Sequence, residues 1–355
     1  MNLFIFLIIL SILIIVHEFG HFIIARRSGV KVEKFSIGFG PVLFTIKGKN
    51  TDFIICLFPL GGYVKMAGDN RLESKGESHE FFAKPVLTRI KIVFAGPFFN
   101  YVFAFILFWA IALMGFPYLE PVVGKVKEGF PAQVSGVKEG DRILSVNGKK
   151  VEHWLDMTQG IRESKTSVLL EIERQGAKIL LTVPLEKTEG GDEFGRKKSV
   201  SIIGIEASSK VKMVKYNLFQ GAFKALEAVY SLTVLTIKGF IFMIVGTLSV
   251  KEAVTGPLGI YYITSETIKL GIVAILNLMA VLSVSLAIVN LLPLPLFDGG
   301  HIFLFLIEKI RRKPVSEKTD ILLTRVGVTI IGVIVLFVFY NDIMKFGSRI
   351  WGKWF

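Results

Sequence analysis

Three ionisable side chains lie inside an apolar run that begins at Met1: His17, Glu18 and His21, within the sequence VHEFGHF. Ionisable groups at membrane depth are costly, so they usually face a polar interior and mark a functional site. On a helix, residues i and i+4 share a face, so His17 and His21 can offer two nitrogens to one metal while Glu18 reaches a metal-bound water. This HExxH spacing predicts a zinc hydrolase. The alternative is a pair of structural histidines that neighbouring helices satisfy.

Asp298 is the candidate for the next metal ligand. A catalytic zinc usually takes three protein ligands and keeps a fourth position for water, so two histidines need a partner. Asp298 follows Pro293 and Pro295, which interrupt an apolar helix. Irregular backbone at membrane depth is tolerated only where it lines a protein or water-filled cavity. The alternative is a turn at which a helix leaves the bilayer and Asp298 meets water.

The composition predicts an integral membrane protein. Hydrophobic residues make up 52% of the 355 residues, and the mean hydropathy is +0.58. The 42 Lys and Arg against 29 Asp and Glu give a net charge of +13, which the positive-inside rule explains, so we expect no nucleic-acid partner. Cys56 is the only cysteine, so no intrachain disulfide can form.

Hydropathy and flanking charges predict four transmembrane helices, at about 3–25, 92–114, 272–292 and 321–340. The first is expected to be a retained anchor, because it lacks the basic start and the small-residue cleavage site of a signal peptide. Arg26 and Arg27 close it and predict a cytoplasmic C-terminal end. The run 228–248 is long enough to span but carries Lys238. A span there would contradict the charge pattern, so it is expected to be an amphipathic, interfacial helix.

Two regions between the spans predict β-structure. Residues 30–66 alternate apolar and other residues between glycines, which predicts short strands that form a membrane-associated β-loop. Residues 115–184 predict a soluble domain, followed by a linker at 188–198 and a last strand at 199–205. The soluble region resembles the core of a PDZ domain of the permuted bacterial type, through Phe130-Pro131-Ala132, Gly136-Val137, GDRIL at 140–144, Asn147-Gly148 and Trp154.

The fold class expected is therefore a polytopic α-helical membrane protein with an inserted PDZ-like α/β domain. The expected divisions are an N-terminal membrane core at 1–114, the PDZ-like domain and linker at 115–212, an amphipathic segment at 213–271 and a C-terminal membrane core at 272–355.

Nearly the whole chain resembles the site-2 intramembrane zinc proteases, in particular the bacterial RseP/RasP group. Four separated motifs carry the resemblance: HEFGH at 17–21, AGPFFN at 95–100, GPLG at 256–259 and NLLPLPLFDGGH at 290–301. The resemblance implies that His17, His21 and Asp298 bind Zn²⁺ and that Glu18 is the catalytic base. It further implies substrate-binding roles for Asn100, Asn290, Pro293 and Pro295, and it identifies GFG at 38–40 with the membrane-associated β-loop.

The chain departs from the better-known members in having room for one PDZ domain instead of two. Phe297 replaces a common Leu, and His301 is expected to be a supporting or surface histidine. The resemblance implies cleavage of single-span membrane proteins such as anti-sigma factors, and of remnant signal peptides, in a bacterial inner membrane. The PDZ-like domain would then be extracytoplasmic, and the active site would lie toward the cytoplasm.

Two other functions fit parts of the pattern. A membrane zinc transporter also places His and Asp within spans, but it predicts several metal sites along a path. Of the five histidines, His79 and His153 fall in soluble segments, so one cluster can form. A non-catalytic scaffold that works through the PDZ-like domain is the second alternative; the complete catalytic set argues against it.

Overall fold

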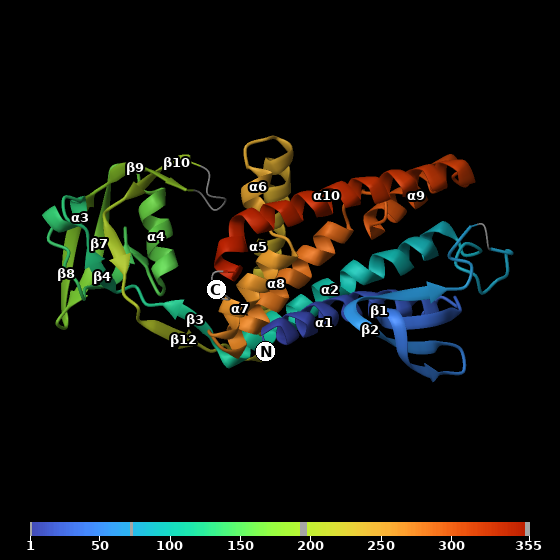
Figure 1. Cartoon of the computed structure of the whole chain (residues 1–355). Coiled ribbons are helices and arrows are strands. Elements are labelled where there is room, and N and C mark those ends of the chain that lie inside the picture. The colour runs from blue at the N-terminus through green and yellow to red at the C-terminus, as the bar shows by residue number, and fades with distance from the viewer. Residues whose placement is uncertain (1, 72–73, 192–196, 352–355) are drawn as a thin grey trace. The chain divides into compact units, whose positions relative to one another are not determined.

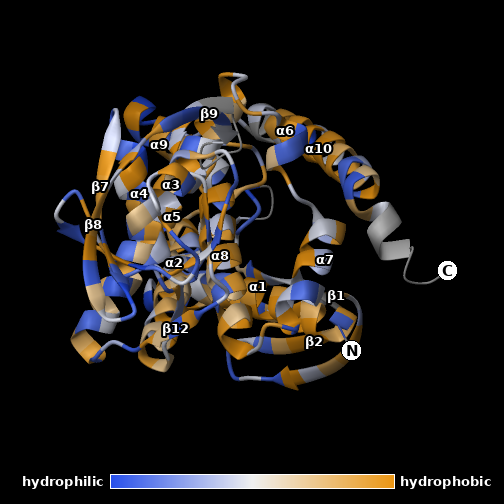
Figure 2. Cartoon of the chain, turned by 90° about the vertical axis from the view of Figure 1, so that its left-hand side faces the viewer, coloured by the Kyte–Doolittle hydropathy of each residue, from blue (hydrophilic) through white to orange (hydrophobic). Residues whose placement is uncertain are grey.

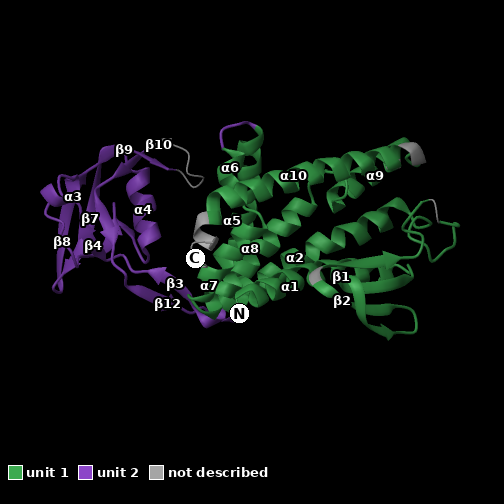
Figure 3. Ribbon diagram, viewed as in Figure 1, with its two compact units in different colours: residues 1–111, 219–244, 249–355 green, residues 112–218, 245–248 purple. Residues whose placement is uncertain are grey.

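The computed structural model describes residues 2–71, 74–191 and 197–351. The chain divides into two compact units (Figure 3). The first comprises residues 1–111, 219–244 and 249–355, and the second comprises residues 112–218 and 245–248.

Helices dominate the first unit (Figure 1). They are α1 (Asn2–Arg27), α2 (Val86–Met114), α5 (Leu218–Ile244), α6 (Val250–Ala253), α7 (Pro257–Ile268), α8 (Ile272–Asn290), α9 (Asp298–Arg311) and α10 (Glu317–Trp351). Five of the described helices are long and apolar enough to cross a membrane, namely α1, α2, α5, α8 and α10. Hydrophobic residues colour long stretches of α10 in Figure 2. The predicted count of four spans is not confirmed, because α5 also meets this criterion.

Helix α1 ends in a glycine-dependent turn. Gly29 adopts φ +69°, the N–H of Val30 donates to the carbonyl of Ala25, and the N–H of Gly29 donates to the carbonyl of Arg26. This pair of bonds is the Schellman motif, which needs a left-handed residue just beyond the helix. The turn sends the chain directly into β1.

Strands β1 (Val32–Lys47) and β2 (Asp52–Met66) each bend and form a small mixed sheet in the first unit. Residues 34–37 pair with 62–65 in the antiparallel sense. They also pair with 52–55, where both numbers rise together, so that pairing is parallel. Residues 44–47 then pair with 52–55 as an antiparallel hairpin. The β-structure expected over 30–66 is present, but as two long, bent strands of 16 and 15 residues instead of short strands. The outer segments 62–65 and 44–47 are the edges.

The second unit is built mainly of strands. These are β3 (Phe116–Leu119), β4 (Val123–Val126), β5 (Arg142–Val146), β6 (Lys149–Lys150), β7 (Ser167–Arg174), β8 (Ala177–Pro184), β9 (Glu186–Gly191), β10 (Lys197–Ile202), β11 (Ile205–Ala207) and β12 (Val211–Val214), with helices α3 (Pro131–Val134) and α4 (Trp154–Glu163). A four-stranded antiparallel sheet in the order β6-β5-β7-β8 packs its apolar face against α4, through residues that include Ile143, Met157 and Leu170.

The linker expected at 188–198 is wrong for its described residues. Glu186–Gly191 pairs with Lys197–Ile202 as two antiparallel strands, and residues 192–196 lie outside the described part. Alternating polar residues satisfy a two-stranded ribbon as well as a loop, so composition alone did not distinguish them.

Candidate metal centre

Two helices bring three potential metal-binding side chains together in the first unit. His17 and His21 lie one turn apart on α1, and Asp298 is the first residue of α9. The Nε2 atoms of the histidines are 3.2 Å apart, and Asp298 Oδ2 lies 3.1 Å from His17 Nε2 and 3.5 Å from His21 Nε2. Both histidines are buried, and Asp298 is half-buried. In the described part of the chain, this is the one group of three or more such side chains.

The spacing of these atoms fits zinc. Ligands at about 2.0–2.2 Å from a tetrahedral zinc are separated from one another by about 3.3–3.6 Å, close to the three separations here. Asp298 Oδ2 is buried and has no hydrogen-bond donor. A cation between these atoms would satisfy all three at once, and such a trio leaves a fourth position open, as in catalytic zinc sites.

Helix α2 orients both imidazoles through contacts with their Nδ1 atoms. His21 Nδ1 lies 2.9 Å from the carbonyl oxygen of Ile92, so Nδ1 carries the proton and Nε2 is free to bind a metal. Asn100 lies 3.3 Å from His17 Nδ1 through its Nδ2 atom, while its buried Oδ1 has no partner. Rotating this amide by half a turn would let Oδ1 accept from His17 Nδ1–H. That arrangement satisfies Asn100 and frees His17 Nε2 as well.

Two glycines allow α1 and α2 to approach closely at the site. A Cβ added at Gly20 would lie 2.8 Å from the carbonyl carbon of Ala95. A Cβ added at Gly96 would lie 2.6 Å from His21 Cε1 and 2.8 Å from His17 Cε1. Real Cβ atoms essentially never come this close. Gly96, in the AGPFFN motif, therefore makes the space that the imidazoles occupy, and sequence reasoning did not assign it this role.

The break between α8 and α9 positions Asp298. Leu296 has φ +75°, and Cβ atoms added at Gly299 or Gly300 would collide with the carbonyls of Leu291 and Leu294, respectively. The two glycines after Asp298 therefore let the break fold against the first turn of α9. The predicted residues Asn290, Pro293 and Pro295 form the end of α8 and the break itself.

His301 lies outside the cluster. It is exposed, packs near Phe305 with ring centroids 6.4 Å apart, and lines a separate cavity of about 220 Å³. The expectation of a supporting or surface histidine stays a prediction.

Glu18 lies beside the sheet. A Cβ added at Gly62 would lie 3.6 Å from Glu18 Cγ. The edge segment 62–65 is therefore next to Glu18. In the HExxH spacing, this glutamate is the residue that accepts a proton from water.

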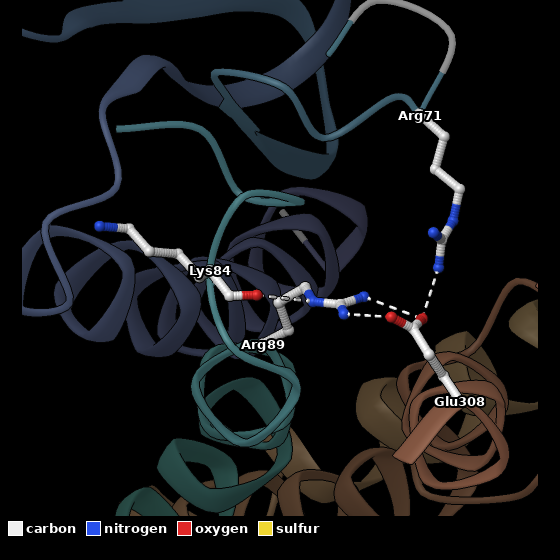
Figure 4. A network of polar contacts seen from close by, with 4 residues as sticks. All are labelled: Arg71, Lys84, Arg89 and Glu308. Carbon is white, nitrogen blue, oxygen red and sulfur yellow. Dashed lines mark hydrogen bonds and ion pairs between the residues drawn. The ribbon is translucent and has the colours of Figure 1, made fainter. Parts of the chain in front are cut away.

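A buried ion-pair network ties α9 to α2 (Figure 4). Glu308 of α9 accepts hydrogen bonds from Arg89 of α2, at 2.5 Å and 3.2 Å, and from Arg71, at 2.7 Å. Arg89 also donates to the carbonyl of Lys84. Burial raises the pKa of Glu308, but the hydrogen bonds from Arg89 and Arg71 outweigh it and hold the pKa below its ordinary value. The network fixes the helix that begins with Asp298.

The chain matches one family model and several named proteins. The model of the family described as peptidase family M50 matches residues 5–334. A Rickettsia conorii protein named as a candidate zinc metalloprotease is 36% identical, with 97% of this chain and 98% of that protein covered. Regulator of sigma-E protease RseP of Escherichia coli is 29% identical, with 96% and 98% covered. Zinc metalloprotease RasP of Bacillus licheniformis is 30% identical, with 96% and 98% covered.

Among solved structures, the PDZ domain of the SdrC-like protein of Listeria monocytogenes matches 25% of this chain and 88% of its own length, with 21% identity and a TM-score of 0.21. The family match covers most of the chain, including both motifs that contain the candidate metal ligands. The chain therefore belongs to peptidase family M50, the site-2 proteases, and is an intramembrane zinc metalloprotease.

Proposed function

We propose that His17, His21 and Asp298 hold the catalytic zinc and that Glu18 is the general base in cleavage of a peptide bond within the membrane. The observation that carries this assignment is the set of three donor atoms 3.1–3.5 Å apart, with Glu18 on the same helix as two of them. A zinc ion held by these three residues would supply Lewis acidity to the peptide carbonyl and to the attacking water. Glu18 takes a proton from the water as its oxygen bonds to the carbonyl carbon, and it delivers that proton to the leaving nitrogen as the C–N bond breaks.

Asn100 and the α8–α9 break have supporting roles in this proposal. Asn100 holds the ring of His17, because its amide contacts Nδ1 and is fully buried. Asn290, Pro293 and Pro295 line the path along which the substrate reaches Asp298. Irregular backbone in this break leaves polar groups that an extended peptide can use, which a continuous helix would not.

The edge segment 62–65 is proposed to bind the unwound substrate as an added strand. A transmembrane helix resists cleavage because its carbonyls are bonded within the helix, so it must be extended first. An edge strand offers unpaired backbone groups to such a segment. Segment 62–65 is the edge beside Glu18, whereas 44–47 is the opposite edge of the sheet.

Proline scanning tests this role of the sheet edge. A proline at Val64, whose N–H faces away from segment 34–37 and toward Glu18, removes an outward backbone donor and is expected to reduce cleavage while zinc content stays unchanged. A proline at Thr45, on the opposite edge, is the matched control. Equal effects of the two prolines on cleavage would remove the edge-strand proposal.

The substrates are proposed to be single-span membrane proteins already trimmed outside the membrane, such as anti-sigma factors, and remnant signal peptides. The printed name of the Escherichia coli relative, regulator of sigma-E protease, supports the first class. The basic end of α1, Arg26 and Arg27, supports a cytoplasmic position for the site, which puts the PDZ-like domain outside the inner membrane. This orientation is consistent with four spans and an interfacial α5.

Cleavage of a single-span reporter by wild type and by Glu18→Gln tests the catalytic assignment, with bound zinc measured in both. The expected result is full zinc content in both proteins and cleavage by the wild type alone. Equal cleavage would refute the role of Glu18. A third protein, His17→Ala, is expected to lose zinc as well as cleavage, which separates a base from a ligand.

A further inference from the structure

A second polar site lies where α1 leaves its apolar run. A cavity of about 430 Å³ lies between the end of α1, the tip of the β1–β2 hairpin and the loop before α2, with Arg26, Lys31, Asn50, Thr51 and His79 in its wall. We propose that this cavity binds the phosphate group of an anionic phospholipid, whose acyl chains lie along the adjoining sheet.

Backbone and buried side-chain bonds fix the walls of the cavity. The Schellman turn at Gly29 sets the direction in which the chain leaves α1. The N–H of Lys31 donates to the carbonyl of His79, and the buried hydroxyl of Thr51 donates to the carbonyl of Val32 at 2.8 Å. Three separate segments of the chain are thus joined around the cavity.

Two cations in the wall of the cavity have no carboxylate partner in the described part of the chain. Arg26 and Lys31 make no ion pair with any carboxylate in the described ranges of the chain. Arg26 instead stacks over the ring of Phe22, 5.4 Å from its centroid. Lys84 adds a third charge, because its Nζ would lie 3.3 Å from a Cβ at Gly29. His79 pairs with Glu77 at 3.4 Å, and that pair is partly exposed. Positive charge therefore exceeds negative charge around the cavity, which favours the binding of an anion.

The surroundings favour a lipid as the source of that anion. Phe22 contacts Phe53 with ring centroids 5.9 Å apart, and Phe53 is paired with Ile46 across the hairpin. Phe53, Ile46 and the neighbouring Phe44 are exposed large apolar residues. A basic pocket beside an apolar surface matches a phosphate head with acyl chains, and clusters of Lys and Arg at the cytoplasmic end of a span attract anionic lipids. An acidic peptide would leave the apolar surface uncovered.

Lipid retention by the full chain tests this proposal independently of cleavage. The protein would be reconstituted in nanodiscs of phosphatidylcholine with a minority of phosphatidylglycerol, and the lipids retained on release would be counted by native mass spectrometry. Arg26→Gln/Lys31→Gln is the test variant. Arg311→Gln/Lys313→Gln removes the same charge from residues that do not line the cavity. Arg26→Lys/Lys31→Arg keeps the charge.

The wild type, the control and the charge-conserving variant are expected to retain phosphatidylglycerol in preference to phosphatidylcholine. The test variant is expected to lose that preference by about 30-fold, which is about 2 kcal/mol for two basic residues. Equal retention by the test and control variants would overturn the proposal. Inorganic phosphate is the second probe: if it displaces phosphatidylglycerol at millimolar concentration, the cavity takes free phosphate, and the lipid assignment is wrong.

Discussion

Gly96→Ala is expected to disable zinc binding while adding only one methyl group. The new Cβ would lie 2.6 Å from His21 Cε1 and 2.8 Å from His17 Cε1, with His21 Nε2 closer still. Ordinary carbon contacts begin at about 3.5 Å, so the rings or helix α2 must retreat by about 0.7–0.9 Å. Metal-ligand distances tolerate about 0.2 Å. We therefore expect zinc affinity to fall by at least about 100-fold, equivalent to about 2.7 kcal/mol.

The assay is competitive zinc binding against a chelator of known affinity, followed by cleavage of a single-span reporter. Gly332→Ala is the matched control, because Gly332 lies on the apolar helix α10 with nothing within 4 Å of an added Cβ. Alanine favours a helix over glycine by about 1 kcal/mol, so the control is expected to bind zinc normally and to be no less stable.

The result that would refute this reasoning is wild-type zinc affinity in Gly96→Ala. It would mean that the close approach of α2 to the imidazoles does not set their position. Loss of zinc together with a normal unfolding temperature for the metal-free protein would locate the defect at the site instead of in the fold.

Three further outcomes are expected. Asn100→Ala should weaken zinc binding by about 10–100-fold, because Asn100 orients the ring of His17. Competition with a chelator would measure the zinc affinity, and an unchanged affinity would mean that Asn100 does not orient His17. Glu308→Gln leaves Arg89 buried without a full charge partner, so the free energy of unfolding should fall by about 3–5 kcal/mol at neutral pH. Because the folded-state pKa of Glu308 is lowered, its contribution is present above about pH 4.5 and is lost as pH falls, so wild-type and variant unfolding temperatures should converge in acid. Asp342→Ala removes the carboxylate that accepts hydrogen bonds from the N–H groups of Gly256 and Gly259. The unfolding temperature of Asp342→Ala is expected to be lower than that of Asp342→Asn, which keeps an acceptor oxygen; equal unfolding temperatures would contradict this role.

The sequence was most informative where chemistry has a fixed spacing. The separation of His17 and His21 places them on one helix face whatever surrounds them, and the prolines before Asp298 mark a break in any apolar helix. Bringing Asp298 to the histidines depends on packing between α1 and α9, which no local pattern contains. The need of a catalytic zinc for a third ligand pointed to Asp298, and the family resemblance implied the same pairing.

Other features depend on contacts that a sequence pattern does not encode. Gly96 looks like any helical glycine until the imidazoles behind it are placed. The alternation over 30–66 predicted strands, but the parallel pairing of 34–37 with 52–55 depends on how the strands bend and fold back. Helix α5 has the length and hydropathy of a transmembrane helix. The prediction of four transmembrane helices therefore depends only on the side of the membrane on which the flanking basic residues are expected to lie. Glu308 and Arg89 form their buried pair only after α9 meets α2.

The order in which the chain is synthesised has a consequence for the metal site. Helix α1, with both histidines and Glu18, emerges first, whereas Asp298 emerges about 280 residues later. At about 5–20 residues per second, that interval lasts roughly 15–55 s. In the proposed site Asp298 is the third zinc ligand, so the metal site cannot be completed during this time. Cleavage by the new protease therefore has to wait until the last part of the chain is made.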